Sequence, residues 1–325
     1  MRVIVHYKSI LHSVISALES VLLTLTEKES EKGQHKVPVA EALAWAAVWF
    51  LAAMAFAAWY WWFVDGAHGR EVANAKTIEY VTGYLIEKAL ATENVFIWVT
   101  LFTYFSVPPE LQKRVLLYGV IGAIVMRAAL IYLGVLLIET FDWMFYVFGL
   151  FLLATGVKML LVGGQQPDLA KNPVIRWIRS HMRVTEGYQG ERFFVMQQGL
   201  RYATPLFLAL VLVEVTDLIF AVDSIPAIFA ITADPFLVFT SNVFAILCLR
   251  SLYFGLAGLI EKFRYLKVSL SLILALVGVK MLAGKWLQQW IGESLNFWML
   301  GLVGGILLIG AVASHWVDGQ KATPT

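Results

Sequence analysis

The sequence predicts an all-α membrane protein with eight transmembrane helices, which include two three-helix repeats of inverted topology. Of its 325 residues, 59% are hydrophobic and 15% are charged, whereas roughly 25% of the residues in soluble domains are charged. The mean hydropathy is +0.72. Eight apolar stretches follow one another along the chain, each near the roughly 20 residues that a spanning helix needs. This composition excludes a soluble enzyme and a protein held by a single anchor.

Hydropathy divides the chain into an N-terminal segment over residues 1–39, a transmembrane domain over 40–316 and a tail over 317–325. Within residues 10–26, apolar side chains recur at helical spacing opposite polar ones, which predicts an amphipathic helix lying on the membrane surface. If this helix spans instead, the chain has nine transmembrane helices. The eight predicted spans are 40–63, 79–106, 112–138, 142–162, 204–232, 236–260, 266–290 and 294–316.

Lysine and arginine distinguish the two sides of the membrane. The side of the N-terminus holds 17 of them, and the opposite loops hold 3. Because basic residues accumulate in cytoplasmic loops, the long loop 163–203 and the C-terminus are predicted to be cytoplasmic. Inside that loop, Asn172 can cap a helix that begins at Pro173. We expect this helix to lie on the anionic inner leaflet through a face formed by Val174, Trp177, Ile178 and Met182.

The sequence lacks the motifs of most enzyme and cofactor sites. Its one cysteine, Cys248, excludes an intramolecular disulfide and dithiol chemistry within the chain. No Gly-rich phosphate loop, Cys-x-x-Cys or His-Glu-x-x-His is present, and the six histidines lie in the tail, in loops or at segment ends. We therefore expect no enzyme activity, no tightly bound cofactor and no nucleic-acid partner. The expected partners are the lipid bilayer and a small ion, and the sequence does not set the oligomeric state.

Two segments, 79–162 and 204–290, repeat the same landmarks in the same order. Each contains two acids six residues apart, a small polar residue after the second acid, an arginine in the next helix and an identical Gly-Val-Lys-Met-Leu run. Because each copy has three helices, the second enters the membrane from the opposite side, as in many secondary transporters. The landmarks are Glu87, Glu93, Asn94, Arg127 and 156–160 in the first copy, and Asp217, Asp223, Ser224, Arg250 and 278–282 in the second.

The carboxylates inside the predicted spans indicate an ion site. A charged side chain at the centre of a bilayer costs about 2.5–3.5 kcal/mol on insertion scales, so such residues usually mark a path or a site. Carboxylate, amide and hydroxyl oxygens suit hard divalent ions such as Mn²⁺, Mg²⁺ or Ca²⁺. We predict one metal site between the two repeats, with its donors drawn from Glu87, Glu93, Asn94, Asp217, Asp223, Ser224 and Glu214.

Helical geometry leaves two arrangements of these acids open. Residues seven apart share a face, so Glu87 aligns with Asn94, and Asp217 aligns with Ser224 in the same way. The second acid of each pair lies six residues on and is rotated by roughly 120°. Either the two acids contact different neighbours, or the helix unwinds so that both point inward. Pro226 cannot donate to the helix ladder, which favours a break in the second copy.

Intramembrane bases offer two further interpretations of the acids. The bases could neutralise the acids as purely structural ion pairs, or the arginines could hold the acids only while the ion is absent. A third possibility is that the acids carry protons, because desolvation favours their neutral form, which would couple export to proton entry. The bases assigned to charge pairing are Arg127, Arg250, Lys158 and Lys280.

The two acidic motifs resemble those of a known family. Gly-Tyr-Leu-Ile-Glu87-Lys-Ala-Leu-Ala-Thr-Glu93-Asn94-Val-Phe and Asp217-Leu-Ile-Phe-Ala-Val-Asp223-Ser-Ile-Pro-Ala-Ile are similar to the paired motifs of the TerC family of bacterial inner-membrane proteins. The resemblance covers about residues 40–316. It implies manganese export, with the motif acids as the ion path. The family is also associated with tellurite resistance, and its nearest members with induction by alkali and with a redox-modulator label.

Two departures from the family pattern affect the prediction. Glu93 stands where the family usually has Asp, and the longer side chain keeps the charge but changes the reach of the ligand. The amphipathic residues 1–36 stand where relatives carry a hydrophobic spanning helix. We predict an inner-membrane exporter of Mn²⁺ or a similar hard divalent cation. The alternative is a membrane-embedded regulatory partner in redox stress or tellurite resistance that transports nothing.

Overall fold

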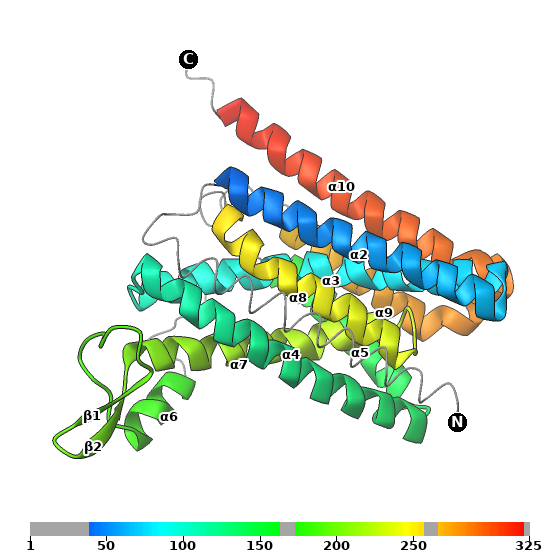
Figure 1. Cartoon of the computed structure of the whole chain (residues 1–325). Helices are drawn as coiled ribbons and strands as arrows, with labels where there is room; N and C mark the ends of the chain where they lie inside the picture. The colour runs from blue at the N-terminus through cyan, green and yellow to red at the C-terminus, as the bar shows by residue number, and fades with distance from the viewer. Residues whose placement is uncertain (1–38, 163–172, 257–265, 322–325) are drawn as a thin grey trace. The chain divides into compact units, whose positions relative to one another are not determined.

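The structure, a computed structural model, describes residues 39–162, 173–256 and 266–321 (Figure 1). The first 37 residues, Met1–Val37, form a separate unit that lies outside the described residues. The amphipathic helix expected at 10–26 falls in that unit and stays a prediction. Every element below belongs to the second unit.

Eight long helices account for the eight apolar stretches. Among the described residues, seven of them are long and apolar enough to cross a membrane. The remaining one, α3, has the length but carries Glu87, Lys88 and Glu93 in its middle. The helices are α2 (Val39–His68), α3 (Arg70–Tyr104), α4 (Pro109–Thr140), α5 (Met144–Val162), α7 (Pro205–Phe229), α8 (Pro235–Leu256), α9 (Leu266–Ile291) and α10 (Leu295–Lys321).

Local sequence explains where several of these helices begin. Pro109, Pro205 and Pro235 stand at the first positions of α4, α7 and α8, where a missing backbone N–H is not needed. Gly69 separates α2 from α3 with a φ of 87°, a conformation that residues with a Cβ rarely adopt. The 3-10 turn η3 (Gly292–Ser294) joins α9 to α10. The last helix runs on to Lys321, so the predicted tail at 317–325 begins as helix rather than as a loop.

The helices pack in defined pairs. Helix α5 lies along α9, α3 lies along α8, and α4 lies along α7. Helix α3 also packs against α7, and α4 against α8, while α2 covers α3 and α8 and α10 covers α9 and α3. One apolar cluster joins Ile86 and Leu90 of α3 to Ala227 of α7 and Leu274 of α9. These contacts place α3, α4, α7 and α8 around a common centre.

Two glycines bring α5 and α9 into backbone contact. A methyl group added at Gly156 of α5 would lie 2.7 Å from the carbonyl oxygen of Ser271. A methyl group added at Gly278 of α9 would lie 2.8 Å from the carbonyl oxygen of Gly149. Only glycine allows so close an approach at either position.

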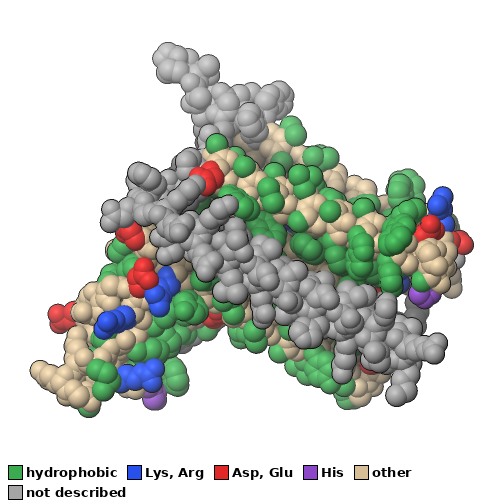
Figure 2. All heavy atoms as spheres, viewed as in Figure 1, with side chains coloured by type: hydrophobic (Ala, Val, Ile, Leu, Met, Phe, Trp, Pro, Cys, Tyr) green, Lys and Arg blue, Asp and Glu red, His purple; other side chains and the backbone are tan. Residues whose placement is uncertain are grey.

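The outer surface of the helices suits lipid. Figure 2 shows hydrophobic side chains along the helices and charged side chains gathered at the two ends of the described part. Large exposed tryptophans cluster where α2 and α9 end and where α5 and α10 begin, which is one end of the helices (Figure 1). An aromatic belt of this kind is typical of a membrane–water interface. The tryptophans are Trp59, Trp62, Trp143, Trp286, Trp290 and Trp298.

The loop between α5 and α7 contains a β-hairpin, although the described residues are otherwise mostly helical, as the all-α prediction expects. Strands β1 (Phe194–Gln197) and β2 (Leu200–Ala203) pair antiparallel through a two-residue turn. Gln198 and Gly199 have φ angles of 52° and 75°, as a type I′ hairpin turn requires. The prediction of helices for all membrane spans is unaffected by this hairpin.

Helix α6 (Pro173–His181) begins at the predicted proline, while its predicted cap, Asn172, lies outside the described residues. The predicted placement of its apolar face against lipid is partly wrong. Ile178, expected to face lipid, is buried in the protein together with Ile175, whereas Trp177 is 60% exposed, as a lipid-facing side chain would be. The reason is that the hairpin and the start of α7 cover this face, where Ile178 joins a cluster with Ala203 and Leu208.

The close contact between α5 and α9 generates a stability prediction. We expect Gly156→Ala and Gly278→Ala each to destabilise the protein, because overpacking a backbone contact costs about 1–3 kcal/mol. Thermal unfolding of the purified protein in detergent measures the effect. Gly284→Ala, also on α9, is the matched control because no atom lies within 4 Å of its added methyl group. Equal melting temperatures for all three variants would contradict the prediction.

A buried charge network and candidate ion site

Four helices meet around the guanidinium group of Arg127, a residue of α4 that is only 2% exposed. Its Nη1 donates to Glu87 Oε1 on α3. Its Nη2 and Nε donate to Oδ1 and Oδ2 of Asp217 on α7, at 3.0 and 3.3 Å. Arg127 therefore bridges one carboxylate from each proposed repeat, and it binds Asp217 with both arms of its fork.

Three uncharged side chains complete this network. Asn94 Nδ2 donates to Asp217 Oδ1 at 3.0 Å. Arg127 Nη1 also lies 3.0 Å from Asn242 Oδ1 on α8 and 3.4 Å from Ser224 Oγ on α7. The alignment of residues seven apart is thus confirmed, since Asn94 joins the network with Glu87, and Ser224 joins it with Asp217.

Among the side chains that the structure describes, the network is unsaturated in both charge and hydrogen bonds. It holds the carboxyl groups of Glu87 and Asp217 and the guanidinium group of Arg127. Three of its atoms, Glu87 Oε2, Asn94 Oδ1 and Asn242 Nδ2, are buried without a hydrogen-bond partner among the described residues. Since buried polar groups in native proteins are nearly all bonded, this cluster has capacity for a further polar ligand.

Glu214 lies beside the network as a third carboxyl group. It interacts electrostatically with Asp217, one turn further along α7. Its side chain fills the space next to Gly122 of α4, where any Cβ would collide with the carboxylate oxygens. One of those oxygens, Oε2, also has no hydrogen-bond partner. Glu214 belongs with the inner acids, although it has no counterpart in the first repeat.

The second acid of each pair faces elsewhere. Glu93 and Asp223 are half-buried and interact with each other electrostatically. Lys267 of α9 attracts Glu93, and Lys158 of α5 attracts Asp223. Of the two arrangements that the six-residue spacing left open, the structure has the one in which the acids contact different neighbours.

The predicted helix break at Pro226 is wrong. Helix α7 continues through Pro226 and ends at Phe229, and α3 is continuous through Glu93. Proline removes one hydrogen bond, to the carbonyl of Val222, and the helix tolerates this loss so close to its end. Without local unwinding, Asp223 cannot turn toward the face that carries Asp217.

The seven predicted donors therefore do not form one metal site in this structure. No three or more His, Cys, Asp or Glu side chains are arranged to hold a metal ion anywhere in the described ranges. The physical reason is that Arg127 occupies the space between the two carboxylates that would share the ion. Glu87, Asn94, Asp217, Ser224 and Glu214 form the inner group, and Glu93 and Asp223 form the outer pair.

The four bases predicted to pair with the acids lie in different surroundings. Arg127 pairs as expected, whereas the side chain of Arg250 lies outside what the structure describes. Lys158 is exposed, and Lys280 is buried with its Nζ donating to Asn296 Oδ1 at 2.8 Å.

Two residues near these acids have roles that the sequence analysis did not predict. Asn242 accepts from Arg127, and its signal in the sequence was a lone amide in an apolar span. The second is Lys267, which lies at the start of a helix and gives no motif.

The segment that leads into the hairpin, residues 185–193, is bonded to the ends of the helices that carry the network. Tyr188 Oη donates to the carbonyl of Phe105, just after α3, at 2.7 Å. Arg114 of α4 pairs with Glu191 at 2.6 Å, and Thr204 before α7 donates to the carbonyl of Arg192 at 2.8 Å. Burial raises the pKa of Tyr188, which keeps its hydroxyl protonated as a donor.

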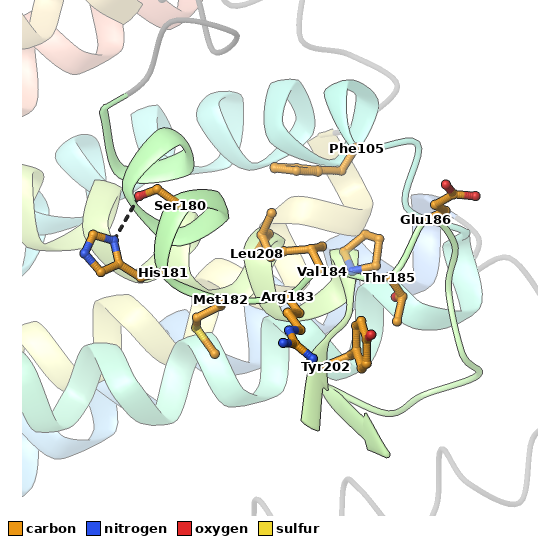
Figure 3. Close-up of a pocket in the computed structure, with 11 residues that line it drawn as sticks. Phe105, Ser180, His181, Met182, Arg183, Val184, Thr185, Glu186, Tyr202 and Leu208 are labelled. Carbon is orange, nitrogen blue, oxygen red and sulfur yellow. Dashed lines mark hydrogen bonds between the residues drawn. The ribbon is translucent and has the colours of Figure 1, made fainter. Parts of the chain in front are cut away.

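A pocket of about 820 Å³ lies at this end of the helices (Figure 3). Phe105, Pro205 and Leu208 supply apolar side chains, and Arg183, Thr185 and Tyr202 supply polar ones. None of the carboxyl groups of the inner group or the outer pair lines it. The pocket is therefore separate from the candidate ion site.

The sequence that carries these acids and Arg127 is similar to that of known proteins. The model of a family described as integral membrane protein TerC family matches residues 72–322. The chain belongs to the TerC family. Its match excludes α2 and includes every residue of the inner group and the outer pair.

Several curated relatives share most of the length of this TerC-family chain. A protein of Escherichia coli K12 named "Putative membrane-bound redox modulator Alx" is 49% identical over 290 residues, or 89% of each chain. The protein of the same name in Photorhabdus laumondii is 48% identical over 303 residues, or 93% of each chain. An uncharacterized membrane protein of Myxococcus xanthus is 42% identical over 288 residues, 89% of this chain and 88% of its own. No solved structure matches.

The buried ion pairs of Arg127 generate a second prediction. Arg127→Met leaves two buried carboxyl groups without a counter-charge, and breaking a buried pair costs about 3–5 kcal/mol. We expect a large fall in the melting temperature in detergent. Adding Glu87→Gln and Asp217→Asn to Arg127→Met removes the unpaired charges, and we expect it to restore much of the loss. If the triple variant is no more stable than Arg127→Met, charge pairing is not what Arg127 contributes.

Proposed function

We propose that this TerC-family protein is a secondary transporter that exports Mn²⁺, or a similar hard divalent cation, across the bacterial inner membrane. The observation that carries the proposal is the buried Glu87–Arg127–Asp217 network, in which two carboxyl groups flank one guanidinium group among the described side chains. The ion is cargo in this proposal, and we assign the chain no catalytic step and no bound cofactor. Charged groups at this depth rarely occur without a role in a path or a site.

Inverted repeats are part of the proposal, and the packing supports them. Exchanging α3, α4 and α5 for α7, α8 and α9 turns the α3–α8 contact into the α7–α4 contact, and both exist. The same exchange turns the α3–α9 contact into the α7–α5 contact, and both exist as well. It also relates Gly156 against Ser271 to Gly278 against Gly149. The inner acids then lie where the two repeats meet, as substrate sites do in inverted-repeat transporters.

Arg127 acts in this proposal as a built-in cation that holds the acids while the carrier is empty. A divalent ion entering the site neutralises Glu87 and Asp217 in its place. Asn242 Oδ1 and Ser224 Oγ already accept from Arg127, and Asn94 Oδ1 is buried without a partner among the described residues, so these three oxygens would supply uncharged ligands nearby. An all-oxygen set of carboxylate, amide and hydroxyl groups suits Mn²⁺ or Mg²⁺ better than a soft metal ion.

The basic residues indicate which side of the protein faces the cytoplasm. They accumulate on the side of the hairpin and of the C-terminus, which we assign to the cytoplasm by the positive-inside rule. The outer pair of Glu93 and Asp223 provides a second pair of carboxyl groups next to the inner group, flanked by Lys267 and Lys158. We propose that it receives the ion as the ion moves to or from the inner site.

Transport is tested directly with purified protein in liposomes that contain a Mn²⁺-sensitive dye. We expect flux for the native chain and none for Asp217→Asn. The variant lacks one of the two carboxylates that would bind the ion in place of Arg127. The matched control is Glu71→Gln at the exposed start of α3, which should transport normally. Absent flux in the native chain, or native flux in Asp217→Asn, would sink the proposal and favour the role of a non-transporting membrane partner.

Mn²⁺ binding without transport provides a further test. If Mn²⁺ and Arg127 compete for the same acids, Mn²⁺ binds Arg127→Met more tightly than the native chain. We then expect Mn²⁺ to raise the melting temperature of Arg127→Met more, because a ligand that binds more tightly stabilises the folded state more. The triple variant that also carries Glu87→Gln and Asp217→Asn is the control and should lose this response. An equal shift in the native chain and Arg127→Met would place the ion elsewhere.

A further inference from the structure

One face of α3 carries a row of polar atoms that lack partners. Ten buried side-chain nitrogen or oxygen atoms have no hydrogen-bond partner in the described part of the chain, and six of them belong to α3. These six side chains, named here the α3 polar stripe, are Thr77, Tyr80, Tyr84, Glu87, Asn94 and Trp98.

The residues of the α3 polar stripe share one face of the helix and extend over about the thickness of a membrane. Steps of three, four or seven residues keep side chains on one face of a helix. From Thr77 to Trp98 the helix rises about 31 Å at 1.5 Å per residue. The hydrocarbon core of a bilayer is about 30 Å thick. The stripe therefore runs from one side of the membrane to the other, and it passes the inner group at Glu87 and Asn94.

Within the described ranges, the two tyrosine hydroxyls have neither an acceptor nor a donor. Tyr80 and Tyr84 are fully buried, and their rings lie parallel with centroids 6.5 Å apart. Phe56 of α2 packs against Tyr80 at 5.2 Å and against Phe244 of α8 at 5.3 Å, so apolar rings surround this part of the stripe. An unpaired buried polar group costs about 1–3 kcal/mol, which makes a row of them hard to explain as packing alone.

An apolar cluster borders the stripe on one side. Ile86 and Leu90, which lie next to Glu87 on the helix, pack into it with Ala227 of α7. Along the stripe itself, Ala91 between Glu87 and Asn94 is small and 1% exposed.

We propose that the α3 polar stripe is the wall of a narrow hydrated path that connects the Glu87–Asp217 pair to the two sides of the membrane. The hydroxyl oxygens of Thr77, Tyr80 and Tyr84 hold water, and take the place of water around a divalent cation, on the way to the pair. The indole N–H of Trp98 donates to water on the other side of it. The identity of the cargo rests on the proposed function, whereas the path itself does not.

Cysteine labelling tests the path without any transport measurement. Cys248 is the only cysteine, so Cys248→Ala provides a thiol-free background. Ala91→Cys and Thr77→Cys then place single thiols on the stripe with little change in volume. Ala227→Cys is the matched control, since Ala227 is fully buried but lies in the apolar cluster. Membrane vesicles are treated with a small cationic methanethiosulfonate that does not cross lipid, and labelling is followed over time.

We expect Ala91→Cys and Thr77→Cys to react at least about tenfold faster than Ala227→Cys, because a thiol in a packed interior reacts only when the structure opens locally. Labelling of Ala91→Cys no faster than that of Ala227→Cys would overturn the path. Variants are compared only if they elute as single species in detergent, and Cys248→Ser replaces Cys248→Ala if the latter does not.

A flux measurement separates the path from its cargo. Tyr84→Phe removes one hydroxyl oxygen and keeps the ring, so we expect severalfold slower Mn²⁺ flux with an unchanged melting temperature. If the native chain shows no flux while Ala91→Cys labels rapidly, the proposed function fails and the path stands. If flux is present but Ala91→Cys stays unlabelled and Tyr84→Phe transports normally, the path fails and the proposed function stands.

Discussion

The guanidinium group of Arg127 lies between two carboxyl groups of the inner group, and the centre of the described helices depends on this arrangement. Charges in a low-dielectric interior are tolerated only when they are paired and hydrogen-bonded. Arg127 therefore ties α3, α7 and α8 to its own helix α4 through side chains from all four. The surrounding residues fit this requirement: Gly122 leaves room for Glu214, and Asn94 satisfies an oxygen of Asp217. In the proposed function, an ion would compete with Arg127 for the same carboxyl groups.

This competition gives a physical reason for leaving polar atoms unpaired. A fully satisfied network would hold Arg127 so firmly that no ion could replace it. Among the described residues, Glu87 Oε2, Asn94 Oδ1 and Asn242 Nδ2 have no hydrogen-bond partner, and the two oxygens are the atoms that a proposed cation could take as ligands. The polar stripe extends the same feature along α3. Both features lie on one helix, which is also the long helix whose composition is least suited to lipid.

Local sequence patterns predicted much of this structure. They could not predict the contacts between helices that are distant in the sequence. Run length and hydropathy locate all eight long helices, and helical periodicity correctly groups Glu87 with Asn94 and Asp217 with Ser224. The division into an inner group and an outer pair depends on whether α3 and α7 stay helical, and Pro226 suggested a break that the packed helix tolerates. The hairpin was missed because its strands are four residues long and its Gln-Gly turn is a weaker signal than Asn-Gly. Charge alone suggested that Arg127 pairs with intramembrane acids, but the sequence could not show that its partners are Glu87 and Asp217.

The close contact of α5 with α9 constrains how the molecule can move. Gly156 and Gly278 let the backbones of these two helices touch, so we expect the pair to stay together when other helices move. Any movement that separates the acids from Arg127 would then involve α3, α4, α7 and α8 rather than this contact. The hairpin, hydrogen-bonded near Phe105, Arg114 and Thr204, would move with those helices. Its tip at Gln198 and Gly199 is therefore a natural place for a distance probe of such a movement.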